Sequence, residues 1–373
     1  MIPILILHIV VIFIAMYFAQ VGVWKNSPGG SSMKFNYGYL ISFLILLLFL
    51  GFRVFLGRDW DNYERIFSSN SQQDFIFGES REIGFLALIS LLRYFEFDFQ
   101  FFVFITTFIT LFLFYFSFRK FYYLLPLGIF VFFTDWGYPV VINTIRQGIA
   151  LMAFLNASCY IDSSEKYAGV KFFSFIFVGL LFHYSILAFI PFYYIGRMKI
   201  KIDYFLPLCI TIALVSLFVI MPLYEDTMSL VEKYEHYADE SYIVNESSSF
   251  GIGATLVLFI RLCPLLIYEY IRKNDSSFLK FFVLYYIGLS VYYGFFKFML
   301  ITRVTFYLQF FELFVMAYFI YYLFVEKKYL RLFGLGYVFL ILFNYVYTFQ
   351  DFLVDQLVSS EFSLMFIDFY YHI

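Results

Sequence analysis

Apolar stretches about as long as a membrane is thick alternate with short polar connections along the whole chain. A transmembrane helix needs about 20 mostly apolar residues. The pattern predicts membrane spans at roughly 2–19, 36–54, 99–118, 121–140, 141–161, 203–222, 251–271, 278–298, 304–325 and 331–350. The first of these lacks a basic leading region and a small-x-small cleavage site, so we interpret it as a span and not as a signal peptide.

Two apolar regions do not fit a single upright span. Residues 172–196 are interrupted by His183 and have basic residues on both sides, which predicts a hairpin of two short helices with His183 at its tip. Residues 83–95 are too short to cross the bilayer and predict an interfacial or re-entrant helix. The sequence therefore predicts an all-α, polytopic integral membrane protein with about 10–12 transmembrane helices plus re-entrant or interfacial helices.

Composition supports lipid as the solvent of this chain. Hydrophobic residues make up 63% and charged residues 14%, whereas soluble proteins are roughly half apolar and about a quarter charged. The net charge of −2 offers no electrostatic footprint for nucleic acid. The three cysteines lie in apolar runs without paired spacing, so neither a disulfide framework nor a metal site is indicated.

The distribution of Lys and Arg predicts the orientation. With the N-terminus outside, most basic residues of the short connections fall on the cytoplasmic side. Two long polar segments, 55–98 and 223–250, then lie outside, and the second is strongly acidic. No internal repeat is evident, which predicts a single transmembrane domain over residues 1–373 with these two external segments.

Several ionisable residues fall inside or close to predicted spans, where a charge costs several kcal/mol and is by default a candidate for function. Arg261 lies halfway along a span, Arg146 lies close to its outer end, and His183 lies at the hairpin tip. Each has a structural alternative. A lone histidine is commonly a packed, hydrogen-bonded side chain, Arg303 and Lys297 can extend to the outer headgroups, and Glu312 is expected to pair with Arg261 or Arg303.

The segment after the second span, LGRDWDNYERIF, mixes acidic and basic residues at the membrane surface. One interpretation is an interfacial helix with Trp60, Tyr63 and Phe67 toward lipid. The other is functional, because a carboxylate such as Asp59 orients a hydroxyl while Arg58 binds phosphate through its planar fork. Phosphate-binding loops, HExxH and paired Cys/His spacings are absent from the sequence, so neither a cofactor nor a metal is expected.

An ordered set of motifs resembles the EpsG family, which is related in role to Wzy-type polysaccharide polymerases. The motifs are GRDW with Tyr63, EIGF from Glu82, NTIRQGIA from Asn143, FHYS around His183, and Arg303 with Tyr307. Trp60 and Leu308 replace aromatic residues that are usual in the family, and neither replacement affects an ionisable group. The resemblance covers about residues 50 to 312.

The resemblance implies a GT-C-like membrane glycosyltransferase that joins undecaprenyl-diphosphate-linked oligosaccharides for O-antigen, capsule or exopolysaccharide. The reaction is expected on the outer face of the bacterial inner membrane, with a chain-length regulator and a flippase as further candidate partners. Asp59 or His183 is expected to deprotonate the acceptor hydroxyl. The residues expected to bind diphosphate or glycan are Arg58, Tyr63, Glu82, Asn143, Arg146, Gln147, Arg261, Arg303 and Tyr307.

Two other functions remain as alternatives. A flippase for the same lipid-linked sugar predicts charges across the full depth of the membrane and an internal repeat. A membrane O-acyltransferase that decorates the polysaccharide would use His183 as its catalytic residue and leave the arginines without a role. The arginines at 58, 146 and 303 all map to the outer third of the bilayer, which favours the polymerase.

Overall fold

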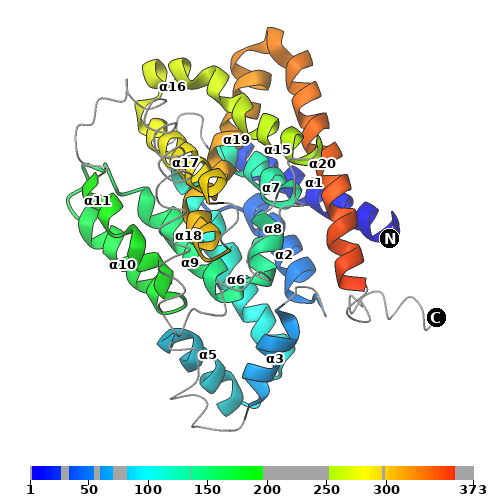
Figure 1. Ribbon diagram of the computed structural model, residues 1–373, viewed down its shortest axis with the longest axis vertical. Coiled ribbons are helices and arrows are strands. Elements are labelled where there is room, and N and C mark those ends of the chain that lie inside the picture. The colour runs from blue at the N-terminus through cyan, green and yellow to red at the C-terminus, as the bar shows by residue number, and fades with distance from the viewer. Residues whose placement is uncertain are drawn as a thin grey trace. The chain divides into compact units, whose positions relative to one another are not determined.

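The computed structural model of the chain describes residues 2–26, 33–53, 59–69, 82–135, 137–195, 252–295 and 299–357. Every regular element in these ranges is helical (Figure 1), and this confirms the all-α prediction. The predicted span 203–222 and the predicted external segment 223–250 lie outside the described residues.

Four of the described helical stretches are long and apolar enough to cross a membrane alone: Leu5–Lys25, Phe99–Lys120, Thr302–Glu326 and Lys328–Thr348. A fifth is obtained if Tyr122–Thr134 and Gly137–Asn143, which bend by 66°, form one broken span. Shorter apolar helices are Tyr37–Gly51, Ile83–Tyr94, Ala168–Leu180, Tyr184–Ile195 and Phe278–Gly294. The protein is therefore a polytopic membrane protein in which full-length spans are combined with short helices.

The chain forms two compact units, which are described separately: Met1–Tyr194 with Ile320–Ile373, and Ile195–Phe319. The described helices of the first unit are α1 (Ile2–Lys25), α2 (Tyr37–Gly51), α3 (Trp60–Ser68), α5 (Ile83–Tyr94), α6 (Phe99–Ser117), η1 (Phe118–Lys120), η2 (Tyr122–Leu124), α7 (Leu125–Thr134), α8 (Gly137–Asn143), α9 (Ile145–Ser158), α10 (Ala168–Leu180), η3 (Tyr184–Phe189), α11 (Pro191–Ile195), η8 (Tyr322–Glu326), η9 (Lys328–Leu330) and α20 (Arg331–Leu357). The described helices of the second unit are α15 (Ile252–Leu262), η7 (Cys263–Ile267), α16 (Tyr268–Asn274), α17 (Ser276–Gly294), α18 (Met299–Gln309) and α19 (Glu312–Tyr321), whose last residues pass into the first unit.

Small residues allow α1 and α2 to pack closely, as is usual between helices in lipid. A Cβ atom on Gly38 would lie 2.4 Å from the backbone nitrogen of Gly22, so no larger residue fits there. Ser42 donates from its hydroxyl to the Ala15 carbonyl at 2.7 Å and lies 2.7 Å from the Tyr115 hydroxyl of α6. These contacts join the first three long helices.

Helix α9 is the core of the first unit. All its side chains are buried except that of Arg146, which is partly exposed. Asn156 donates to the Leu113 carbonyl of α6 at 2.8 Å, and a Cβ atom on Gly179 of α10 would lie 3.2 Å from the Ala153 side chain. Helices on two sides therefore hold α9 in one position, and with it the side chains at its ends.

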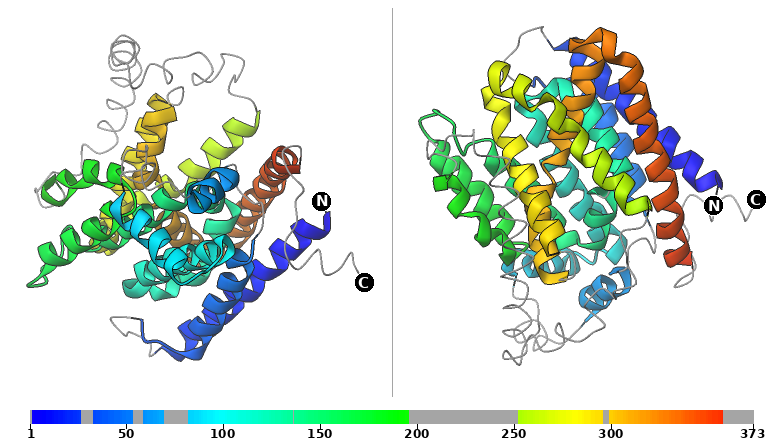
Figure 2. Two further views of the ribbon diagram at one scale, coloured as in Figure 1. Left: turned by 90° about the horizontal axis from the view of Figure 1, so that it is seen from below. Right: turned by 45° about the horizontal axis from the view of Figure 1, so that its top comes forward.

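The last described helix, α20, returns to the first one. Figure 2 shows α20 beside α1, and the Tyr345 hydroxyl lies 3.5 Å from Nδ1 of the buried His8. In the second unit, Phe281 of α17 stacks on Phe311 and Phe314 at centroid distances of 5.7 and 4.8 Å. These rings therefore pack against protein within the second unit.

Three sequence predictions have definite outcomes in the short helices. The hairpin predicted at 172–196 is present as α10 followed by η3 and α11. The ring centroids of Phe172 and Tyr193, near its two ends, lie 4.9 Å apart. The helix predicted at 83–95 is α5. The span predicted at 141–161 is interrupted at Thr144, where the hydroxyl bonds back to the Val140 carbonyl at 2.7 Å and the backbone leaves the helical region. The break places Arg146 in the first turn of a new helix.

Candidate functional site

The Glu82 carboxylate joins two cation-forming side chains that are distant in the sequence. Its Oε2 atom accepts a hydrogen bond from Nη1 of Arg146 at 2.6 Å, and its Oε1 atom lies 3.0 Å from Nδ1 of His183. The Glu82 side chain is only 6% exposed, whereas those of Arg146 and His183 are 24% and 29% exposed. A buried carboxylate thus lies behind two partly exposed groups.

Close backbone approach positions Glu82. The residue directly precedes α5, and the backbone N–H groups of Gly84 and Phe85 donate to the Leu181 carbonyl at 2.9 and 3.1 Å. A Cβ atom on Gly84 would lie 2.5 Å from the Leu181 Cβ atom, so only glycine allows this contact. The start of α5 is therefore fixed on the turn that carries His183.

That turn follows the last residue of α10. The His183 N–H donates to the Gly179 carbonyl at 2.8 Å, and His183 itself precedes η3 with an extended backbone. Gly179 is also the point of close contact between α10 and α9. His183 is in this way held at a fixed position relative to the helix that carries Arg146.

Aromatic rings surround the Arg146 guanidinium. Its Cζ atom lies 5.4 Å from the centroid of Phe85 and 6.0 Å from that of Tyr63. Arginine is attracted to such ring faces while its N–H groups bond to a carboxylate. Phe85, which belongs to the same EIGF motif as Glu82, thus packs beside the Arg146–Glu82 pair. This contact could not be predicted from the sequence.

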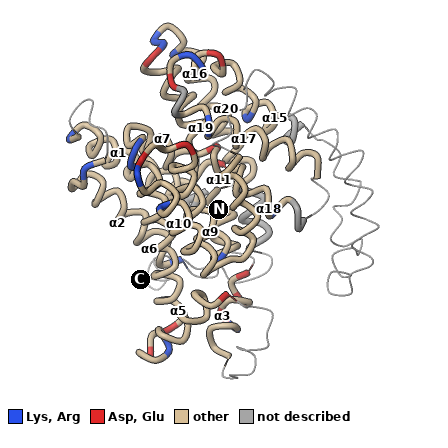
Figure 3. Tube along the Cα trace, turned by 90° about the vertical axis from the view of Figure 1, so that its left-hand side faces the viewer, with Lys and Arg blue, Asp and Glu red and all other residues tan. Residues whose placement is uncertain are grey.

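Helix α3 covers this cluster with its apolar side. The ring centroids of Trp60 and Phe99 lie 5.0 Å apart, and those of Tyr63 and Phe85 lie 6.0 Å apart. The side chains of Trp60, Tyr63 and Phe67 are all buried. The interpretation that this face meets lipid is wrong, because protein rings cover it. Figure 3 shows charged residues close to α3 and α5, while most of the trace is uncharged.

Asp59 lies at the start of α3, partly exposed, and its carbonyl accepts the Tyr63 N–H at 3.0 Å. Burial raises the pKa of the Tyr63 phenol, the Arg146 charge opposes this rise, and the Asp59 charge adds to it. Tyr63 is therefore a neutral hydroxyl between the predicted base Asp59 and Arg146 at physiological pH.

The electrostatic balance at Glu82 favours the ionised form. Burial alone raises the pKa of the Glu82 carboxyl, but the hydrogen bond with His183 and the charge and hydrogen bond of Arg146 more than offset it. The pKa of Glu82 is consequently below its ordinary value. A carboxylate that stays charged beside an imidazole is suited to orient that ring.

The remaining predicted residues divide between the two units. In the first unit, Asn143 ends α8 and Gln147 is buried on α9 beside Arg146, while Arg58 lies outside the described residues.

In the second unit, Arg303 is exposed and Tyr307 fully buried on α18. Arg261 lies with its Nε atom 3.9 Å from Oε2 of Glu312, both side chains being buried, as the expected structural pairing of Glu312 requires. Within the described ranges no group of three His, Cys, Asp or Glu side chains is arranged to hold a metal.

The model of the EpsG family matches this chain over residues 36–360. Comparison with curated proteins and with solved structures gives no match. The matched range includes Glu82, Arg146 and His183.

Proposed function

This chain belongs to the EpsG family, a family of Wzy-type polysaccharide polymerases, and from this premise we propose that it joins undecaprenyl-diphosphate-linked oligosaccharide repeat units. The acceptor hydroxyl oxygen attacks the anomeric carbon of the donor sugar. The bond from that carbon to the diphosphate oxygen breaks, and undecaprenyl diphosphate leaves. Because the donor is already activated, the reaction needs a base and cationic groups but no nucleotide.

The observation that carries the proposal is the Glu82 carboxylate between Arg146 and His183. In this proposal Nδ1–H of His183 donates a hydrogen bond to Glu82. The lone pair of the imidazole is then on Nε2, where it takes the proton of the acceptor hydroxyl. Arg146 keeps Glu82 ionised and in place. His183 is thus the catalytic base in this proposal, and Glu82 and Arg146 are positioning residues.

Asp59 is the other candidate base from the sequence. It lies at the start of α3, and its carbonyl bonds to the N–H of Tyr63, which in turn packs against Phe85. The histidine is favoured because a carboxylate holds its ring and because a neutral imidazole nitrogen accepts a proton from a hydroxyl. Diphosphate binding by Arg146 and Arg303 remains a prediction.

Purified protein in proteoliposomes, supplied with lipid-linked repeat units, tests the proposal. A ladder of lengthening glycans on a gel supports a polymerase. Movement of the substrate across the bilayer without a ladder indicates a flippase, and acyl transfer to the glycan indicates an acyltransferase. His183→Ala is expected to slow chain extension by about a hundred- to ten-thousand-fold, and Asp59→Asn by much less. The reverse order assigns the base to Asp59.

Orientation is tested separately with single cysteines, after Cys159, Cys209 and Cys263 have been replaced. Asn62 on α3 and Ser164 in the α9–α10 connection are both exposed and belong to the same unit. In intact cells, Asn62→Cys is expected to react with a membrane-impermeant maleimide, and Ser164→Cys only after lysis. The opposite pattern contradicts an outward-facing reaction.

A further inference from the structure

A second arginine of the first unit, Arg53, is buried and forms no ion pair with a carboxylate of the described residues. It follows α2 directly, is 4% exposed, and donates from Nη1 to the Leu50 carbonyl at 2.9 Å and to the Thr107 hydroxyl at 2.8 Å. Its Nε–H has no hydrogen-bond partner among the described residues. Among the residues that the structure describes, no acidic side chain forms an ion pair with Arg53, in contrast to Arg146.

Arg53 borders a cavity of about 20 Å³. A volume of about 10–15 Å³ is enough for one water molecule, so the cavity accepts one oxygen atom but no whole sugar or phosphate group. Its lining includes Arg53, Thr106, Thr107, Thr110, Tyr138 and Ile145. Ile145 directly precedes Arg146, so the cavity adjoins the α8–α9 break at the candidate site.

Two of the lining threonines direct their protons to backbone carbonyls. Thr106 donates to the carbonyls of Phe102 and Val103, and Thr110 donates to the Thr106 carbonyl. Arg53 also lines the cavity, and its Nε–H is a charged donor without a partner in the described part of the chain. A buried guanidinium charge without a counter-charge is unfavourable, and an anionic oxygen relieves it better than water does.

We infer that the Arg53 cavity receives one phosphoryl oxygen of a lipid-linked diphosphate, which makes Arg53 a phosphate-binding residue beside the Glu82–Arg146–His183 cluster. This inference rests on the proposed function. The two arginines have different partners in this proposal. Arg146 forms an ion pair with Glu82, whereas the Nε–H of Arg53 donates to the substrate. The charge that remains unpaired in the free protein is compensated when the diphosphate binds.

The test uses the full chain in nanodiscs with farnesyl diphosphate as the probe, and with farnesol and inorganic diphosphate as references. Arg53→Met is expected to weaken farnesyl diphosphate binding at least about tenfold and to leave farnesol binding unchanged. Arg331→Met is the matched control, because Arg331 is an exposed arginine on α20, and it is expected to bind the probe like wild type.

Thermal melting separates binding from folding. Without ligand, Arg53→Met is expected to melt no lower than wild type, because the substitution removes an unpaired buried charge. Arg53→Lys keeps the charge but lacks the Nε–H, so a severalfold loss of probe binding is expected even if the methionine variant does not fold.

The outcomes distinguish the two proposals. If wild type and Arg53→Met bind farnesyl diphosphate equally, or if Arg53→Met melts lower yet binds normally, Arg53 is structural and the inference fails while the polymerase proposal stands. If inorganic diphosphate binds as tightly as the lipid and with the same dependence on Arg53, the lipid-linked source is wrong. If wild type binds farnesyl diphosphate no better than farnesol, the donor class proposed for the enzyme fails as well.

Discussion

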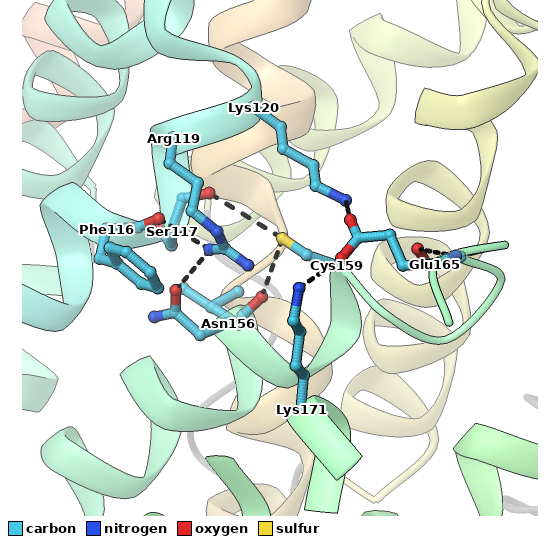
Figure 4. A network of polar contacts seen from close by, with 10 residues as sticks. Phe116, Ser117, Arg119, Lys120, Asn156, Cys159, Glu165 and Lys171 are labelled. Carbon is cyan, nitrogen blue, oxygen red and sulfur yellow. Dashed lines mark hydrogen bonds and ion pairs between the residues drawn. The ribbon is translucent and has the colours of Figure 1, made fainter. Parts of the chain in front are cut away.

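A carboxylate lies between two cation-forming side chains near each end of α9, yet the two clusters differ in burial. At the N-terminal end, Glu82 is 6% exposed between Arg146 and His183. At the C-terminal end, Glu165 is 38% exposed between Lys120 at 2.9 Å and Lys171 at 2.6 Å (Figure 4). Similar pairs of contacts thus occur in different dielectric surroundings.

The C-terminal cluster is attached to a buried amide. Arg119 donates to the Asn156 side chain at 2.9 Å, and Asn156 donates in turn to the carbonyls of Leu113 and Met152. Figure 4 shows Arg119 and Asn156 on one side of this network and Glu165 with its lysines on the other. The buried amide fastens α6 to α9, and the lysine pairs lie at the surface.

The comparison shows that ion-pair geometry alone does not identify a site. Exposed pairs contribute about 0–1 kcal/mol because water screens them. A buried carboxylate is expensive to leave unpaired, so a chain that keeps one at a partly open position has either a structural or a chemical reason for it. The partners of Glu82, Arg146 and His183, are partly exposed to solvent. This favours a catalytic role of the cluster over a purely structural one.

Among the variants that test this comparison, the largest effect is expected for Glu82→Gln. The amide cannot hold His183 in the required tautomer and leaves Arg146 without its counter-charge. Chain extension in proteoliposomes is expected to fall by about a hundredfold or more, and the free energy of unfolding by about 3 kcal/mol. Normal extension by a folded Glu82→Gln protein would refute the positioning role.

Arg146→Lys is expected to have the next largest effect. Lysine keeps a positive charge for Glu82 but loses the planar contact with Phe85 and Tyr63 and the forked donors. We expect chain extension to slow about tenfold, with a smaller loss of stability than for Glu82→Gln. Arg119→Lys at the other end of α9 is the control for replacing an arginine in this unit. Equal activity losses for the two variants would indicate a general packing effect.

The stability contribution of Glu82 is expected to depend on pH. Because its folded-state pKa is lowered from 4.5, the stabilisation is fully present above the unfolded-state value and is lost as the pH falls through the folded-state value. The difference in melting temperature between wild type and Glu82→Gln is therefore expected to narrow as the pH falls well below 4.5. A difference that does not narrow in this acidic range contradicts the ionised carboxylate.

The smallest effect is expected for Glu165→Gln. Hydrogen bonds from Lys171 and Lys120 lower the pKa of Glu165 to about 2, but the group is exposed, so the stability loss is expected to stay below about 1 kcal/mol. Chain extension is expected to be unchanged. A loss of activity comparable to that of Glu82→Gln would remove the contrast between the two ends of α9.

Much of the fold could be predicted because hydrophobic length reports directly on the bilayer. The hairpin around His183 and the short helix after Glu82 were both visible as apolar stretches of unusual length. The break at Thr144 was not visible, because it depends on a local hydrogen bond that competes with the helix. The burial of Trp60 was misjudged since an amphipathic face does not reveal whether lipid or protein covers it.

For the candidate site, the sequence by itself determined which residue types were available: a membrane-embedded arginine, a histidine in an apolar hairpin and a glutamate before a short helix. Only the tertiary structure decided that they meet, over separations of 64 and 101 residues. The deciding contact is the one between Gly84 and Leu181, which is a matter of backbone approach. The tertiary structure likewise decided that Arg53, at the end of a predicted span, is buried without a counter-charge from the described residues, because pairing depends on which side chains packing brings within reach.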